Sequence, residues 1–213
     1  MGKEMKRKLY FALKNDGKER KFNIKVKFLG FSLGTFNFYA YFCKKQLLME
    51  QNLFIELLES GEKVSLYSPR FDGEEYTEFE KFLLTYKENY LQDIHILVRR
   101  IDIIKANGAE DRYFRYEGKR KDRVMALPSH FDTSNLRLYC LNINHKILIL
   151  GNGGLKNSQT YQEDPTLHKA VQTLQRIDIK IKQLENKQVI TISGTNLNGP
   201  LELSVNTDNQ EED

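Results

Sequence analysis

The stretch from Asn135 to Lys156 sets the strongest limits on how this chain folds. Bulky residues occupy both faces of 136–141, and residues 147–150 are all apolar, as is typical of a strand buried on both faces. The segment 142–145 between them includes two asparagines, which tolerate the left-handed conformations of hairpin turns. The stretch therefore predicts two paired strands, and we expect the second strand to stop at the glycine-rich residues 151–154.

Two amphipathic helices are predicted ahead of this hairpin. Asp72 is a helix-capping residue type, and apolar side chains recur at spacings of three and four between residues 76 and 86. A second apolar stripe runs over residues 91–104 and is followed by Asn107-Gly108, a pair typical of helix C-termini. Helices joined this closely predict an antiparallel helical hairpin whose stripes cover a sheet.

The remaining elements predict an α+β fold. Strands are expected at 111–117 and 123–127, which together with the hairpin of 135–150 make an antiparallel four-stranded sheet. Asp164-Pro165 predicts the start of a third, C-terminal helix, because Asp caps helices and Pro is favoured at their first position. The last predicted element is a small hairpin within 189–205.

The N-terminal part of the chain predicts a separate β-rich extension over residues 1–62. Strand patterns and turns before residue 43 indicate a β-meander with one basic face, whereas residues 46–59 fit a helix loosely. The predicted main domain covers 63–205. Residues 206–213 are predicted to form a disordered acidic tail.

The charge distribution leaves two interpretations open. The net charge is only +4, but lysines and arginines crowd residues 3–27, and the chain ends in acidic residues. This arrangement fits either nucleic-acid contact with self-shielding or two solvated ends. The two cysteines lie in strand-like runs and predict core residues in a reducing compartment. We find no zinc-binding pattern and no apolar segment of membrane-spanning length, so we expect a cytoplasmic protein without a metal, a cofactor or a membrane partner.

Cations and aromatic residues alternate in the segment 112–123. RNA-binding surfaces favour such mixtures, because cations neutralise phosphates and aromatic rings stack on bases. The alternative interpretation is a charged hairpin whose aromatic residues lie partly in the core. The candidate RNA-binding residues are Arg112, Arg115, Lys119, Arg120, Arg123 and, on the neighbouring strand, Tyr139.

Other catalytic patterns are weak. The run Gly151-Asn152-Gly153-Gly154-Leu155-Lys156 lacks the spacing and the Lys-Ser/Thr pair of a phosphate loop, which argues against a nucleotide cofactor. Its glycines are expected to keep space open at the sheet edge. The four histidines are scattered, and each is predicted to be a surface residue, with His130 the one to watch.

Two helices are followed in this sequence by a basic hairpin, then by Leu-Arg-Leu-Tyr-Cys-Leu, a turn, Lys-Ile-Leu-Ile-Leu-Gly-Asn-Gly-Gly-Leu-Lys and Glu-Asp-Pro. This order resembles the RelE/ParE toxin superfamily. Within it, the pattern is most similar to the HigB or phage-derived branch, and the resemblance covers roughly residues 63–184. It implies a toxin that is neutralised by a cognate antitoxin, which we expect to be a helix-turn-helix protein. It also implies a ribosome-dependent mRNA endonuclease that needs no metal and uses the 2′-hydroxyl to attack the adjacent phosphate.

Carried over by position, Arg137 matches the strand arginine of the family and Lys156 its basic residue after the last strand, so both are candidate catalytic residues. The hairpin cations would hold phosphates. Tyr139 would stack on a base, unless its alternation points it into the core. Asn157 stands where many relatives carry a second arginine, and the C-terminal Tyr or Asp-Tyr-His cluster of some nucleases has no clear counterpart. The alternatives are a protein-binding, ParE-like or phage-derived toxin without nuclease activity, and a basic nucleic-acid-binding protein.

Overall fold

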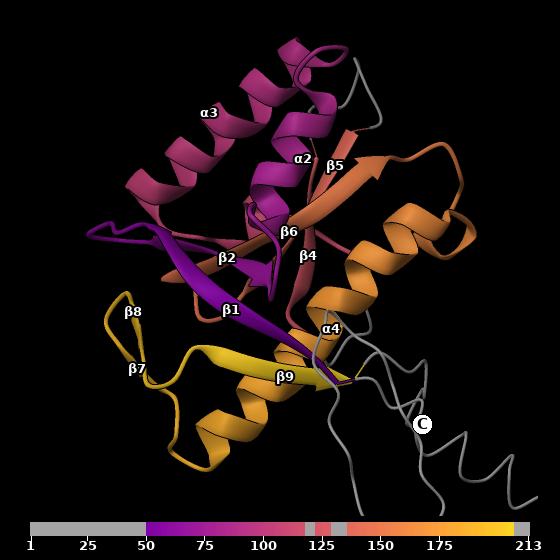
Figure 1. Ribbon diagram of the computed structural model, residues 1–213. Coiled ribbons are helices and arrows are strands. Elements are labelled where there is room, and N and C mark those ends of the chain that lie inside the picture. Colours follow the sequence, from indigo (N-terminus) through magenta and orange to yellow (C-terminus); the bar gives the residue numbers. More distant parts are fainter. Residues whose placement is uncertain (1–49, 118–121, 129–135, 207–213) are drawn as a thin grey trace, which may run out of the picture. The chain divides into compact units, whose positions relative to one another are not determined.

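The computed structural model describes residues 50–117, 122–128 and 136–206, which all belong to one compact unit of the chain (Figure 1). Its class is α+β, as predicted. In chain order the elements are β1 (Glu50–Glu59), β2 (Ser65–Phe71), α2 (Glu78–Tyr86), α3 (Leu91–Asn107), the short 3-10 helix η1 (Asp111–Tyr113), β3 (Arg115–Tyr116), β4 (Val124–Pro128), β5 (Leu136–Asn142), β6 (Ile147–Leu155), a second 3-10 helix η2 (Tyr161–Glu163), α4 (Pro165–Asn186), β7 (Thr191–Ser193), β8 (Asn196–Asn198) and β9 (Glu202–Asn206).

The sheet is larger than the predicted one and is mixed. Its seven strands follow the order β3-β4-β5-β6-β2-β1-β9. Strands β3 to β6 pair antiparallel, although the strand predicted over 111–117 is shortened to β3 because 111–113 form η1. Strand β2 adds to β6 in parallel, with Ser65 opposite Ile147 and Tyr67 opposite Ile149. The prediction of a four-stranded antiparallel sheet is therefore wrong, because the sequence pattern of β2 gives no information about its distant partner.

Helices cover both faces of this sheet (Figure 1). Side chains alternate along β5, so Leu136 and Leu138 pack with the apolar stripes of α2 and α3, while Tyr139 and Leu141 pack against α4. Since both faces are buried, β5 carries bulky residues on each side. Residues 147–150 are buried as well, which confirms their interpretation as a strand buried on both faces.

The helix ends follow local capping rules. Thr77, not Asp72, caps α2: its hydroxyl accepts from the backbone of Glu80, and the Glu80 carboxylate accepts from the backbone of Thr77. The prediction at Asp72 is wrong because Gly73, with φ +78°, makes a turn there. The predicted end of α3 at Asn107-Gly108 is confirmed. The predicted start of α4 is confirmed as well, with the Asp164 side chain accepting from Thr166 and Leu167.

The strand was predicted to stop at the glycine-rich residues 151–154. This prediction is wrong, because β6 continues to Leu155. A Cβ atom at Gly151 would lie 2.9 Å from Leu174 Cδ1, and one at Gly154 would lie 3.0 Å from Leu167 Cδ2. The missing side chains therefore let α4 approach the strand closely. The space that the sequence analysis assigned to an open sheet edge is filled by α4.

The two ends of the described chain pair with each other. Residues 50–59, which fitted a helix loosely, form strand β1, whose buried side chains Leu53 and Ile55 alternate with more exposed ones. β9 pairs with β1 rather than closing the hairpin predicted for 189–205, and the local hairpin is instead β7–β8. The predicted extension 1–62 lies mostly outside the described residues and stays a prediction, as does the acidic tail.

Candidate functional site

Arg137 is the centre of a group of charged side chains on the α4 face of the sheet. It lies on that face because it alternates with Leu136 and Leu138, which face α2 and α3. The residue is 9 % exposed, and its Nη1 donates to the carbonyl of Leu136 at 3.0 Å. Its Nε is buried and has no hydrogen-bond partner. Burial, and then the nearby charge of Arg115, lower the pKa of this guanidinium.

Lys156 and Arg137 are linked through Glu117. The Lys156 ammonium lies 3.5 Å from Glu117 Oε1, and both side chains are mostly buried. The same carboxylate acts electrostatically on Arg137 and favours its charged form. The two predicted catalytic residues thus share one neighbour, Glu117, which directly follows β3. We call Arg115, Glu117, Arg137, Tyr139 and Lys156 the Arg137 cluster.

Tyr139 is a core residue rather than an exposed base-stacking residue, because its ring is buried with 0 % exposure. Its hydroxyl is buried and lacks a partner. Burial, together with the charge of Glu117, raises the pKa of this phenol, so the group stays protonated at neutral pH. The hydroxyl is a hydrogen-bond donor without an acceptor. Such a buried donor lowers the stability of the fold unless a bound group supplies the acceptor.

The start of α4 lies near Tyr139 of the cluster, since Tyr161 and Asp164 act electrostatically on the Tyr139 hydroxyl. Tyr161 in η2 is buried and its ring stacks on His168, with centroids 6.1 Å apart. His168 Nδ1 is a third buried polar atom without a partner. Sequence analysis had taken His168 for a surface residue. The only local signal was its place one residue after Leu167, the side chain that packs on Gly154.

A further tyrosine approaches the same place from α2. Tyr86 Oη would lie 3.1 Å from a Cβ atom at Gly154. Burial, and then the charge of Asp164, raise the pKa of Tyr86. Glycine at this position therefore permits side chains of α2 and α4 to meet at the end of β6.

The other predicted RNA-binding residues are dispersed. Arg112 is exposed, lies 3.1 Å from Glu110 Oε2, and stacks over Tyr113 with its guanidinium carbon 5.0 Å from the ring centroid. Arg123 is engaged by α4, with Nε 2.5 Å from Asp178 Oδ1 and Nη2 3.2 Å from Glu185 Oε2. Arg115 lies near Arg137, while Lys119 and Arg120 fall outside the described residues.

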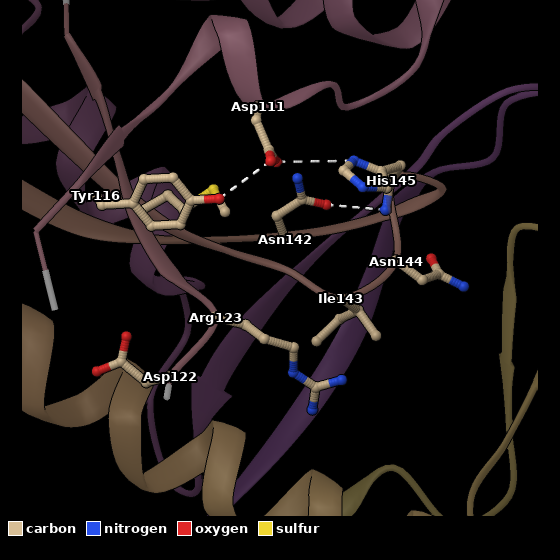
Figure 2. Close-up of a pocket in the computed structure, with 9 residues that line it drawn as sticks. Asp111, Tyr116, Asp122, Arg123, Asn142, Ile143, Asn144 and His145 are labelled. Carbon is tan, nitrogen blue, oxygen red and sulfur yellow. Dashed lines mark hydrogen bonds and ion pairs between the residues drawn. The ribbon is translucent and has the colours of Figure 1, made fainter. Parts of the chain in front are cut away.

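A second polar region opens near the β5–β6 turn (Figure 2). It is a pocket of about 350 Å³, whose lining includes the predicted RNA-binding residue Arg123 together with Asp111, Tyr116, Asp122, Ile143 and His145. The Tyr116 hydroxyl donates to Asp111 Oδ2 at 3.0 Å, and His145 Nδ1 lies 2.8 Å from the carbonyl of Ala109 and 3.9 Å from Asp111 Oδ1. We call this region the Tyr116 pocket.

No helix within the described ranges is both long and apolar enough to cross a membrane, and no group of three or more His, Cys, Asp or Glu side chains in those ranges is arranged to hold a metal ion. In comparisons with protein-family models, with curated proteins and with solved structures, no match to this chain was found.

Proposed function

We propose that this protein is an RNA endonuclease of the toxin type, and that the Arg137 cluster is its reaction centre. One observation carries the proposal: the cluster contains buried hydrogen-bond donors, Arg137 Nε and Tyr139 Oη, that have no acceptor. Buried donors are rarely left unpaired without a reason, and cations around them favour an anionic acceptor. A phosphate group of RNA supplies that acceptor.

The residues fit cleavage by the neighbouring 2′-hydroxyl. The 2′-oxygen forms a bond to phosphorus while the bond from phosphorus to the 5′-oxygen breaks, which yields a 2′,3′-cyclic phosphate and a 5′-hydroxyl. Glu117 is the candidate to accept the 2′-hydroxyl proton, and His168 is the candidate to donate a proton to the leaving oxygen. Arg137 and Lys156 oppose the negative charge that develops on the phosphate, and the Tyr139 hydroxyl donates a hydrogen bond to it.

Burial imposes one condition on this reaction. Arg137 and Tyr139 are almost fully covered, whereas the side chain of Lys156 is 21 % exposed. The phosphate reaches Arg137 only if the segment from Tyr161 to His168 moves away from β5. We propose that docking on the ribosome with a bound mRNA produces this movement, which would make activity ribosome-dependent.

The remaining parts of the proposal follow from the family resemblance. The protein would act in the cytoplasm and would be neutralised by a cognate antitoxin. The fold order of two helices and a strand hairpin before α4 supports this assignment, because it is the order on which the resemblance rests.

The burial of Arg137 also favours a second candidate function, a toxin that binds a protein target. If α4 never leaves the sheet, Arg137 is a structural residue and the protein is a toxin that binds a protein target without cutting RNA. The third interpretation, nucleic-acid binding by the basic N-terminal segment, depends on residues outside the described part.

Induced expression in bacteria, followed by mapping of mRNA ends, tests the proposal. Arg137→Ala and Lys156→Ala should each lower the cleavage rate about 100- to 1,000-fold, the usual cost of losing a charge-stabilising group. Lys146→Ala is the matched control, because this exposed lysine lies in the β5–β6 turn away from the cluster. Cleavage should leave cyclic phosphate ends. Growth arrest with intact mRNA would instead support the protein-binding toxin.

A further inference from the structure

We infer that the Tyr116 pocket binds one nucleobase of the RNA strand, and that it prefers bases with an exocyclic amino group, namely adenine, cytosine and guanine, over uracil. This inference rests on the proposed function, since it assigns a substrate subsite to the same enzyme. The pocket volume of about 350 Å³ lies within the range of small-ligand sites, which is roughly 300–1,000 Å³.

Tyr116 supplies a stacking surface. It lies on the edge strand β3 and is 66 % exposed, the largest exposed fraction among the big apolar and aromatic side chains that the structure describes. Its hydroxyl is fixed by Asp111, so the ring is held beside the pocket rather than free to rotate away (Figure 2). A fixed and exposed aromatic face is what single-stranded RNA binding uses for stacking on a base.

The pocket also has an apolar part. Met125 and Ile143 are 6 % and 8 % exposed, and both contribute to its lining. A planar base can therefore contact apolar atoms as well as the Tyr116 ring. The pocket thus combines the two kinds of contact that hold a base without reading its identity.

The polar rim supplies the selectivity. Asp111 supplies a carboxylate whose two oxygens can accept further hydrogen bonds beside the one from the Tyr116 hydroxyl, and Asp122 adds a second carboxylate to the lining. Carboxylates accept from exocyclic amines, as in the pairing of Asp or Glu with cytosine N4. Carboxylates repel phosphates, and the cation in the lining, Arg123, is already paired with Asp178 and Glu185, so the sugar-phosphate chain should stay outside the pocket.

The position of β3 connects this pocket to the Arg137 cluster. Side chains alternate along a strand, so Arg115 and Tyr116 point to opposite faces of the sheet edge. Arg115 acts on Arg137, whereas Tyr116 lines the pocket. An RNA strand that crosses the edge at β3 can place a phosphate near Arg115 and a nearby base against Tyr116.

The test measures binding of AMP, CMP and UMP, and of the matching hexanucleotides, to the full-length protein by NMR titration and fluorescence anisotropy. Tyr116→Ala should weaken binding of the adenine hexamer roughly 5- to 150-fold, because one stacked base contributes about 1–3 kcal/mol. Tyr116→Phe should retain most of the affinity. Tyr76→Ala is the matched control, since Tyr76 is exposed but lies outside the pocket.

A separate substitution tests the preference for bases with an exocyclic amino group. Asp111→Asn should reduce the discrimination between AMP and UMP about tenfold, which is within the usual contribution of a base-edge contact. Resonances of Tyr116 and His145 should shift when AMP is added, and those of Tyr76 should not.

The outcomes separate the two proposals. RNA cleavage that is lost in Arg137→Ala but is indifferent to Tyr116→Ala and to base identity would overturn the pocket and leave the nuclease intact. Base binding that depends on Tyr116 in a protein that cuts no RNA would uphold the pocket and reject the nuclease. Absence of any shift with all three mononucleotides, together with hexamer binding that ignores Tyr116, would also overturn the pocket.

Discussion

The Arg137 cluster and the Tyr116 pocket lie toward opposite ends of β5 and differ in how their polar groups are satisfied. In the cluster, Arg137 Nε and Tyr139 Oη are buried and unpaired. In the pocket, the Tyr116 hydroxyl and the Asp111 carboxylate are exposed and bonded to each other. Buried unpaired groups destabilise a fold, whereas exposed paired groups cost little.

This difference indicates at which of the two regions a bound ligand would stabilise the protein more. A phosphate at the cluster would satisfy groups that the folded chain leaves unpaired. A base in the pocket would add contacts to groups that already have partners. Ligand binding should therefore stabilise the cluster more than the pocket.

Removal of Asp178 should have the largest effect, because this 1 % exposed carboxylate connects α4 to the start of β4 by accepting from Arg123. It also accepts from Lys182, one turn along the same helix. Asp178→Ala leaves a mostly buried guanidinium without its main partner. It should lower the free energy of unfolding by about 3–5 kcal/mol, as measured by urea denaturation. Glu185→Ala is the control, since it removes the longer and more exposed contact to the same arginine. Equal losses in the two variants would contradict this account.

Loss of a single hydroxyl should distinguish the two regions directly. Tyr139→Phe removes a buried group without a partner and should raise the free energy of unfolding by about 1–2 kcal/mol. Tyr116→Phe removes an exposed hydroxyl and should change it by less than about 0.5 kcal/mol. Thermal unfolding measures both. If Tyr139→Phe were destabilising, its hydroxyl would have a partner in the folded protein, and the contrast would fail.

Glu78 provides an intermediate case, because it is largely buried but accepts from Asn152 at 2.9 Å and from Lys81 at 2.8 Å. Burial raises the pKa of this carboxyl, so the folded protein binds its proton more tightly than the unfolded chain does. Stability is then lost as the pH rises from about 4.3, the pKa of an unperturbed glutamate, through the raised value. Glu78→Gln should lack this loss, so the melting temperature of the variant should rise relative to that of the wild type as the pH increases above about 4.3. A pH-independent difference would show that the charge is compensated.

Local sequence rules predicted the elements whose ends are set by nearby residues. Asp164-Pro165 and Asn107-Gly108 mark helix ends through contacts within one turn, and both were located correctly. The paired strands of 136–150 were identified for a similar reason, since their apolar run is local. Residue 72 was misassigned because the capping box of Thr77 and Glu80 competes for the same helix start.

The elements and residues that depend on distant partners were not predictable in this way. β1 has spacings that fit a helix, and only its pairing with β2 and β9 makes it a strand. His168 becomes part of the candidate site through its packing on Tyr161, which no local pattern encodes. Arg137 and Lys156 were identified as candidate catalytic residues by a resemblance, and Glu117, which connects them, was not singled out beforehand.

The pairing of β1 with β9 has a consequence for protein synthesis. Phe54 pairs with Glu202, so one edge of β1 lacks this partner until about 150 further residues have been translated. At bacterial and eukaryotic elongation speeds this takes roughly 8 to 30 s. During that time the nascent chain exposes an unpaired strand edge with apolar residues, a feature that invites aggregation. Chaperone demand should therefore fall sharply when the last strand leaves the ribosome.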